Sequence, residues 1–190
     1  MTKTITIFVS ACLGIAIGVV GSHMVVPRHE SPYLKHPQRL SDVVAAILVM
    51  GTYKFDSMPT DTWQECIGGR PNSAASWADV FTQHPEFFRS TGRDKAGKDK
   101  WSLVWRRARP YAWDTETGKA IGQDELKEWA PEDKEKRLSR EPLRPEDATK
   151  LAEMAVNMQT QEIARREELR WWVPVVVGVI CVFIGARIKS

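Results

Sequence analysis

The stretch FFRSTGRDKAGKDKWSLVWRR, from Phe87 to Arg107, has the pattern of two β-strands joined by a flexible polar turn. Side chains of a strand alternate between its two faces, so Trp101, Leu103 and Trp105 are expected to point the same way. A small domain has little core, and large aromatic side chains fill a core effectively. We therefore expect this hairpin to pack its tryptophans against helices.

The same stretch is rich in basic residues, which could instead contact the phosphates of a nucleic acid. The candidate contacts to a polyanion or a partner are Arg93, Lys95, Lys98, Lys100, Arg106, Arg107 and Arg109. A DNA-binding protein normally neutralises phosphates near its recognition helix, but the segment before this hairpin, 73–83, contains no lysine or arginine. Nucleic-acid binding therefore stays an alternative to a structural role for the hairpin.

Helical patterns precede the hairpin. RLSDVVAAILVMGTYKF has apolar residues near a 3.6-residue period, which predicts a helix capped by Ser41 and ended by Gly51. In the segment that follows, Thr60 and Asp61 open a second, short helix, which a glycine pair stops.

A third helix is predicted over SAASWADVFTQH, starting at Asn72 or Ser73. Its expected buried face consists of Trp77, Val80, Phe81 and His84. Three short helices followed by a two-stranded ribbon is the element order of a winged helix. We expect an α+β fold with a winged-helix-like domain over residues 39–113.

Two apolar runs flank this domain. The first, over residues 4–27, has 24 residues, which as a helix would be about 36 Å long, enough to cross a bilayer core of about 30 Å. The second, over 171–187, contains an apolar run of 16 residues between Arg170 and Arg187. The expected membrane-interface residues of the second span are Arg170, Trp171, Trp172 and Arg187.

The first run could also be a cleaved signal peptide or a lipoprotein signal. It is longer than the apolar region of a typical signal peptide, and its apolar character continues well past Cys12, the residue that lipidation would need. We therefore expect two transmembrane helices, with the lipid bilayer as a partner of the chain.

Small residues recur every four positions in the first run, at Ser10, Gly14, Gly18 and Ser22. On a helix they would form one shallow ridge, which lets a second helix approach closely in lipid. The ridge predicts helix–helix packing. The partner of the ridge could be the second span, another copy of the chain or a different membrane protein.

Basic residues near the ends of the runs predict the orientation. Six such residues adjoin the central domain, namely Arg28, Lys35, Arg39, Arg165, Arg166 and Arg170, against Lys3, Arg187 and Lys189 on the tail side. Because basic residues favour the inside, we expect a cytoplasmic central domain. The reversed orientation would make the protein a periplasmic sensor or an accessory subunit of a membrane complex.

The remaining segments are expected to connect these parts. Residues 28–38 form a connector, 114–144 a charged connector, and 145–170 a helix that leads into the second span, with tails at 1–3 and 188–190. An apolar stripe on that helix is expected to lie on the domain or on a second copy: Leu151, Met154, Ala155 and Met158.

Motifs of known chemistry are missing from the sequence. We find no nucleophile elbow, phosphate-binding glycine loop or zinc-protease motif, and the four histidines stand singly. Cys12, Cys66 and Cys181 form no CxxC pair. We therefore expect no enzyme activity, no cofactor, no metal and no small-molecule substrate.

Three blocks, RLSDVVAAILVMGTYKF, SWADVFTQHPEFFR and SLVWRR, resemble sequences of uncharacterised bacterial two-pass membrane proteins with a small winged-helix-like central domain. The resemblance covers Arg39 to Arg107. It implies this fold and a place in the inner membrane, and it carries no known activity. The expected function is a protein-interaction or regulatory module at the membrane surface, with a membrane-tethered nucleic-acid-binding regulator as the alternative.

Overall fold

The computed structural model of the chain describes residues 31–168 and 172–188. The chain divides into two units, Met1–Glu30 and Ser31–Ser190, of which the second is described below. The first apolar run lies outside the described residues. The expected ridge of Ser10, Gly14, Gly18 and Ser22 therefore stays a prediction.

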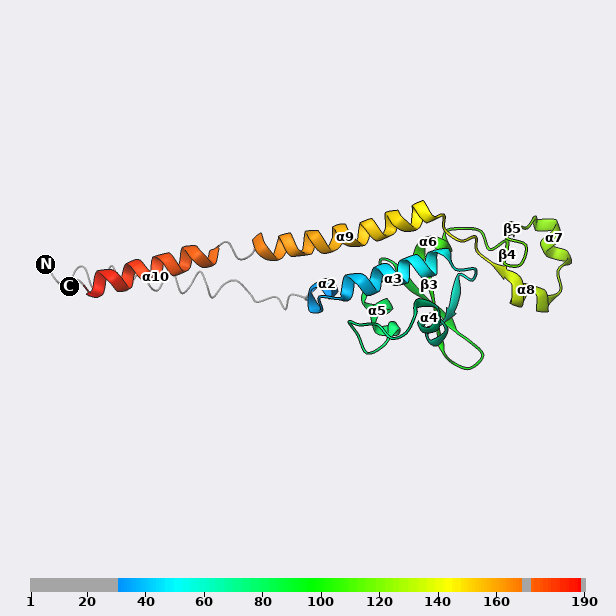
Figure 1. Cartoon of the computed structure of the whole chain (residues 1–190), viewed down its shortest axis with the longest axis horizontal. Coiled ribbons are helices and arrows are strands. Elements are labelled where there is room, and N and C mark those ends of the chain that lie inside the picture. The colour runs from blue at the N-terminus through cyan, green and yellow to red at the C-terminus, as the bar shows by residue number, and fades with distance from the viewer. Residues whose placement is uncertain (1–30, 169–171, 189–190) are drawn as a thin grey trace. The chain divides into compact units, whose positions relative to one another are not determined.

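The second unit has mixed α and β structure with two small antiparallel sheets (Figure 1). Its first part contains α2 (Pro32–Lys35), α3 (Arg39–Thr52), β1 (Ser57–Pro59), α4 (Thr60–Ile67), α5 (Trp77–Gln83), β2 (Phe88–Arg93), β3 (Asp99–Leu103) and α6 (Val104–Arg107). Its second part contains β4 (Trp113–Asp114), β5 (Lys119–Ala120), α7 (Gln123–Glu128), α8 (Pro131–Arg137), β6 (Leu138–Ser139), α9 (Pro145–Glu168) and α10 (Trp172–Ile188). The α+β class expected from the sequence is confirmed.

The predicted helices of the central domain are present as α3, α4 and α5. The predicted ends of α3 are wrong: it begins at Arg39, so Ser41 lies in its first turn, and it continues to Thr52, past Gly51. α4 ends where the glycine pair predicts, because Gly68 adopts a left-handed conformation (φ 103°) and donates its backbone N–H to the carbonyl of Gln64. α5 starts later than expected, at Trp77. Its start is set by a capping box, in which the Ser76 hydroxyl accepts from the Asp79 backbone N–H and the Asp79 carboxylate accepts from that of Ser76.

The predicted hairpin is confirmed as β2 and β3. They pair antiparallel, with Phe88 opposite Leu103 and Arg93 opposite Asp99. β1 adds to the other edge of β3, which gives the order β1-β3-β2. Between Ser90 and Gly92 a bulge shifts the register of the pairing.

The second strand of the hairpin ends at Leu103, four residues before the end of the predicted strand pattern at Arg107. After Leu103 the chain turns into the short helix α6, so the alternation of the strand does not continue. Trp101 and Leu103 are buried as expected, but Trp105 is 46% exposed and Arg106 is fully buried in its place. The prediction that Trp105 packs in the core is therefore wrong.

One hydrophobic core joins the helices to the first sheet. Aromatic rings from three elements meet in it: Phe81 lies 4.8 Å from Phe88 and 5.5 Å from Trp101, centroid to centroid. The indole N–H of the fully buried Trp63 donates to the carbonyl of Trp101 over 2.9 Å, which ties α4 to β3. The expected face of α5, including His84, is buried.

α3 and α9 pack along each other in opposite directions (Figure 1). Gly51, near the end of α3, lies against Ala148, near the start of α9. α2, which precedes α3, also packs on α9. The chain therefore enters this domain at Ser31 and leaves along the last turns of α9 at the same end.

The expected stripe on α9 is partly confirmed. Leu151 and Ala155 are buried in the core and Met158 packs against it, whereas Met154 is exposed. Leu151, Ala155 and Met158 thus lie on the domain of their own chain, and Met154 does not.

A second sheet occupies the segment expected to be only a charged connector. Its strand order is β5-β4-β6. Leu138 of β6 and Ile121, directly after β5, are buried, and the segment also holds the exposed helices α7 and α8. Residues 114–144 had too few apolar residues to predict this sheet from periodicity.

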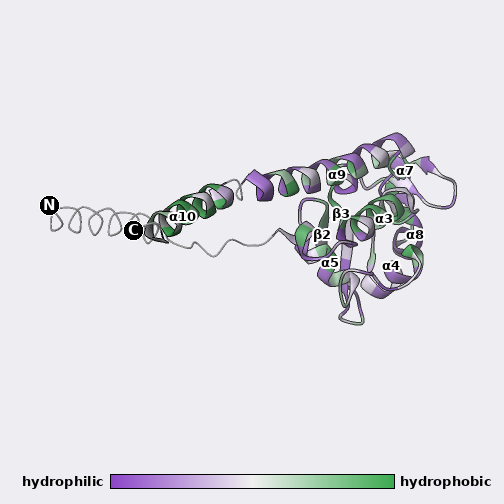
Figure 2. Cartoon of the chain, turned by 60° about the vertical axis from the view of Figure 1, so that its left-hand side comes forward, coloured by the Kyte–Doolittle hydropathy of each residue, from purple (hydrophilic) through white to green (hydrophobic). Residues whose placement is uncertain are grey.

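α10 is apolar on all sides, unlike the other helices (Figure 2). Each of its side chains whose exposure the structure describes is exposed. Among the described residues, one helix, in the carboxyl-terminal part of the chain, is long and apolar enough to cross a membrane, by length and composition. Seventeen residues of α10 correspond to about 26 Å of helix.

Candidate interaction surface

The turn between β2 and β3, together with the strand residues that flank it, is called the wing below and comprises residues 93–100. Its conformation is fixed locally: the Asp94 carboxylate accepts the backbone N–H groups of Ala96 and Lys98, both over 2.8 Å. Gly97 supplies the left-handed residue that the turn needs, with φ 79°. The wing is therefore a defined turn.

Three of the four basic side chains of the wing, those of Arg93, Lys95 and Lys98, contact carboxylates. Arg93 pairs with Asp99 across the hairpin, with Nε 3.1 Å from Oδ1. Two other pairs reach outside the hairpin: Lys95 Nζ lies 2.6 Å from Glu135 Oε1 on α8, and Lys98 bonds Asp61 at the start of α4. The wing thus meets two other elements through its lysines.

These contacts shift the pKa values of the groups involved. The hydrogen bond from Lys95, and then the charges of Lys95 and Lys100, lower the pKa of Glu135. Asp61 raises the pKa of Lys98 through a hydrogen bond and its charge, and Lys98 lowers that of Asp61 mainly by the same hydrogen bond. Both carboxylates therefore favour their charged form beside the wing.

Arg106 does not face solvent. Its guanidinium lies within 2.5–3.4 Å of five backbone carbonyl oxygens, those of Met50, Tyr53, Lys54, Phe55 and Arg140. The first four surround the end of α3, where unpaired carbonyls carry partial negative charge, and the fifth follows β6. Burial lowers the pKa of Arg106 to about 10, so the side chain stays charged at neutral pH.

The other predicted contacts of this run are divided between the surface and the interior. Arg107 is exposed, while Arg109 is largely covered and pairs with Glu141 and with Asp147 of α9. Arg106 and Arg109 are thus engaged in holding the chain together. The predicted basic surface is reduced to Arg107 and the wing.

A buried polar cluster near α2 was not predicted as a unit. The Tyr33 hydroxyl donates to Glu86 Oε1 over 3.2 Å, and Nδ1 of the fully buried His84 lies 2.9 Å from the same oxygen. Burial and the negative charge of Glu86 raise the pKa of Tyr33. Burial opposes the charge of Glu86, but hydrogen bonds, led by that from His84, outweigh it and lower its pKa. No spacing rule links residues 33, 84 and 86.

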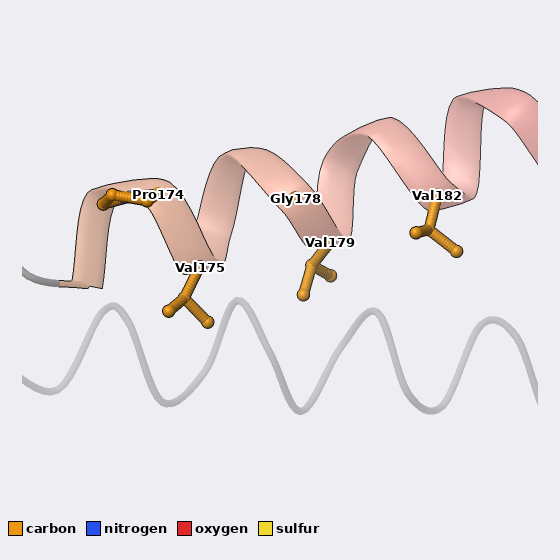
Figure 3. Close-up of a pocket in the computed structure, with 5 residues that line it drawn as sticks. All are labelled: Pro174, Val175, Gly178, Val179 and Val182. Atoms are coloured by element: carbon orange, nitrogen blue, oxygen red, sulfur yellow. The ribbon is translucent and has the colours of Figure 1, made fainter.

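One face of α10 has a shallow hollow. Val175, Val179 and Val182 point to the same side of the helix, and Gly178 and Pro174 complete the lining (Figure 3). At the start of α10, Trp172 is 52% exposed. Arg187 lies in the last turn of α10, and the other two predicted interface residues, Arg170 and Trp171, lie outside the described residues.

Residues 31–168 and 172–188 contain no group of three or more histidine, cysteine or acidic side chains placed to hold a metal ion. Within the same ranges Cys66 and Cys181 are free thiols.

No protein-family model, curated protein or solved structure matches this chain.

Proposed function

We propose that this chain is a two-pass integral membrane protein of the bacterial inner membrane. It presents a small winged-helix-like domain at the membrane surface, on the cytoplasmic side, as a non-enzymatic protein-interaction or regulatory module. The observation that carries the proposal is the antiparallel packing of α3 on α9, because it makes the chain enter and leave the domain at one end. Two flanking apolar segments that begin at one end of a domain fit a single lipid surface.

The winged-helix-like assignment is supported by element order and strand pairing. The order α3, β1, α4, α5, β2, β3 and the sheet order β1-β3-β2 are those of a winged helix. In such a fold α5 is the third helix and the wing is the turn of the final hairpin.

A protein partner is supported by the side chains that the domain exposes. Trp105 and Tyr111 are 46% and 48% exposed, and tryptophan, tyrosine and arginine are the residue types that dominate binding energy at protein interfaces. Arg107 lies two residues from Trp105. These three side chains are the expected contact residues for a partner protein.

The membrane assignment is tested by fractionation of lysed cells. The full chain is expected in the sediment after ultracentrifugation and after a carbonate wash, and to be released only by detergent. Recovery in the supernatant without detergent would refute the proposal. A reporter fused to the carboxyl terminus then tests the orientation: a periplasmic signal is expected, and a cytoplasmic one would favour the reversed, periplasmic-facing domain.

The contact residues are tested by affinity purification of the full chain from detergent. Partner recovery is expected to fall in Trp105→Ala. Met154→Ala, which removes an exposed apolar side chain of α9, is the matched control and is expected to leave recovery unchanged. Equal recovery from all three proteins would remove Trp105 from the contact surface.

A second candidate function is nucleic-acid binding through the wing. It is favoured by one observation, the high exposure of Arg93, Lys95 and Lys98 on the hairpin turn. A mobility shift of a short DNA duplex by the full chain in detergent tests it. Binding that weakens steeply with added salt is expected if the wing contacts phosphates.

A further inference from the structure

Two lysines of the wing, Lys95 and Lys98, contact carboxylates from two elements that are distant in the sequence. Glu135 on α8 is 40 residues from Lys95, and Asp61 on α4 is 37 residues from Lys98. We propose that Asp61 and Glu135 mask the wing, and that a nucleic-acid backbone binds the wing lysines in competition with these two carboxylates. The proposal rests on the second candidate function above.

The charges in the wing add up to a surface that the two carboxylates neutralise. Residues 93–100 contain four basic and two acidic side chains, a net charge of +2. Asp61 and Glu135 together contribute −2, which brings the sum to zero. Neither carboxylate is needed for the turn itself, which Asp94 and Gly97 already fix.

The masking contacts are weak enough for a ligand to displace. Lys95 is 87% exposed and Glu135 is 65% exposed, and pairs this open to water contribute little to stability. A phosphodiester backbone presents closely spaced anions and gains from the release of its counterions. It can therefore compete with isolated surface carboxylates.

The position of the wing favours a nucleic acid over the lipid of the chain's own membrane. Glu135 lies on α8, which leads into β6, and Arg140 just beyond β6 meets Arg106 at the end of α3. α2 and the last turns of α9 lie at the other end of α3. The wing is therefore at the end of the domain opposite to the one where the chain enters and leaves.

Removal of the two carboxylates tests the mask. The variant Asp61→Asn/Glu135→Gln raises the net charge of the full chain by two. The matched control Glu125→Gln/Glu132→Gln makes the same change of net charge with exposed side chains of α7 and α8. All proteins are held in discs of neutral lipid, and binding of a fluorescent DNA duplex is followed by anisotropy at about 50 and about 150 mM salt.

If the two carboxylates mask the wing, the variant Asp61→Asn/Glu135→Gln is expected to bind the duplex about three to ten times more tightly than both the wild type and the control variant. The gain is expected to shrink at the higher salt concentration, because exposed charges are screened. Adding Lys95→Gln and Lys98→Gln to the unmasked variant is expected to abolish the gain.

Each other outcome overturns the mask in a distinguishable way. If the wild type binds and the unmasked variant binds no better than the control, the mask is refuted and nucleic-acid binding stands. If no protein binds the duplex, nucleic-acid binding itself is refuted. If the unmasked variant gains affinity for vesicles of anionic lipid but not for the duplex, the surface is one for lipid.

Discussion

Arg106 of α6 and two lysines of the wing are basic side chains of one short stretch of sequence, and they contact other segments of the chain in different ways. At the end of α3, Arg106 is fully buried among five carbonyl oxygens. In the wing, Lys95 faces one exposed carboxylate. A fully buried guanidinium must keep its hydrogen bonds, whereas an exposed lysine can exchange its partner for water at little cost.

Arg106 also joins the second sheet to the first part of the domain. It bonds the carbonyls at the end of α3 and the carbonyl of Arg140 at the same time, and Arg140 places its Nε 3.3 Å from Asp56. Leu143 donates its backbone N–H to Gly51 at the same junction. The second sheet is therefore fastened to the first part of the domain at this point.

The largest expected effect comes from Arg106→Leu, which leaves the carbonyls at the end of α3 without donors. We expect a loss of about 3–5 kcal/mol in the free energy of unfolding. Urea unfolding of the full chain in detergent, followed by tryptophan fluorescence, measures it. Arg107→Leu, at an exposed neighbouring position, is the control and should change stability by less than about 0.5 kcal/mol. Equal effects of the two variants would show that the buried hydrogen bonds of Arg106 do not stabilise the fold.

A smaller effect is expected in the second sheet, where Asp114 is buried. Its carboxylate accepts hydrogen bonds from Arg137, the Glu116 backbone N–H and the Thr117 hydroxyl. These bonds, led by those of Arg137, lower the pKa of Asp114 well below its ordinary value.

Because that pKa is lowered in the folded state, the stabilisation is present above the unfolded value of about 4 and is lost as the pH falls further. Asp114→Asn should therefore be less stable than the wild type at pH 7, and the difference should narrow as the pH falls below about 4. Unfolding midpoints measured over this pH range test it. A difference that stays constant with pH would mean that the carboxylate charge is not what stabilises the sheet.

A loss of about 1 kcal/mol is expected for Ser76→Ala, which removes the hydroxyl that caps α5. This contact is local and partly exposed, so the expected loss of stability is smaller than that of Arg106→Leu and larger than that of Lys95→Gln. Thr82→Ala, at an exposed position of the same helix, serves as the control and should have a smaller effect. Circular dichroism during thermal unfolding gives both values.

The smallest effect is expected in the wing. Lys95→Gln removes one exposed ion pair and should leave the unfolding midpoint unchanged within error, because such pairs stabilise little. A clear loss of stability would show that the wing fastens α8 to the domain, as Arg106 fastens β6.

Sequence patterns predicted the elements whose signals are local. The glycine pair after α4, the period of α3 and the alternation around Trp101 each depend on a few neighbouring residues, and each element formed. The start of α5 was misplaced because two serines precede it, and only the second, Ser76, has an acidic residue at the spacing that completes a capping box.

The roles of the basic residues could not be read in the same way. Arg106 and Arg107 are neighbours of the same type, and their difference depends on where β3 ends. The end of β3 coincides with the burial of Arg106 against carbonyls that are remote in the sequence. The cluster of Tyr33, His84 and Glu86 likewise joins residues that no local pattern connects. Contacts between distant segments decide these roles, and periodicity carries no information about them.

The common exit of the chain at α2 and the last turns of α9 has a mechanical consequence. A force that pulls the chain before α2 away from the chain after α9 would separate these two helices first, because they contact each other at this end of the domain. The bond from Tyr33 to Glu86 would be loaded early, and Arg106, at the opposite end of α3, would feel the pull last. Lateral tension would thus disturb the contact of α2 with α9 before it affected the wing.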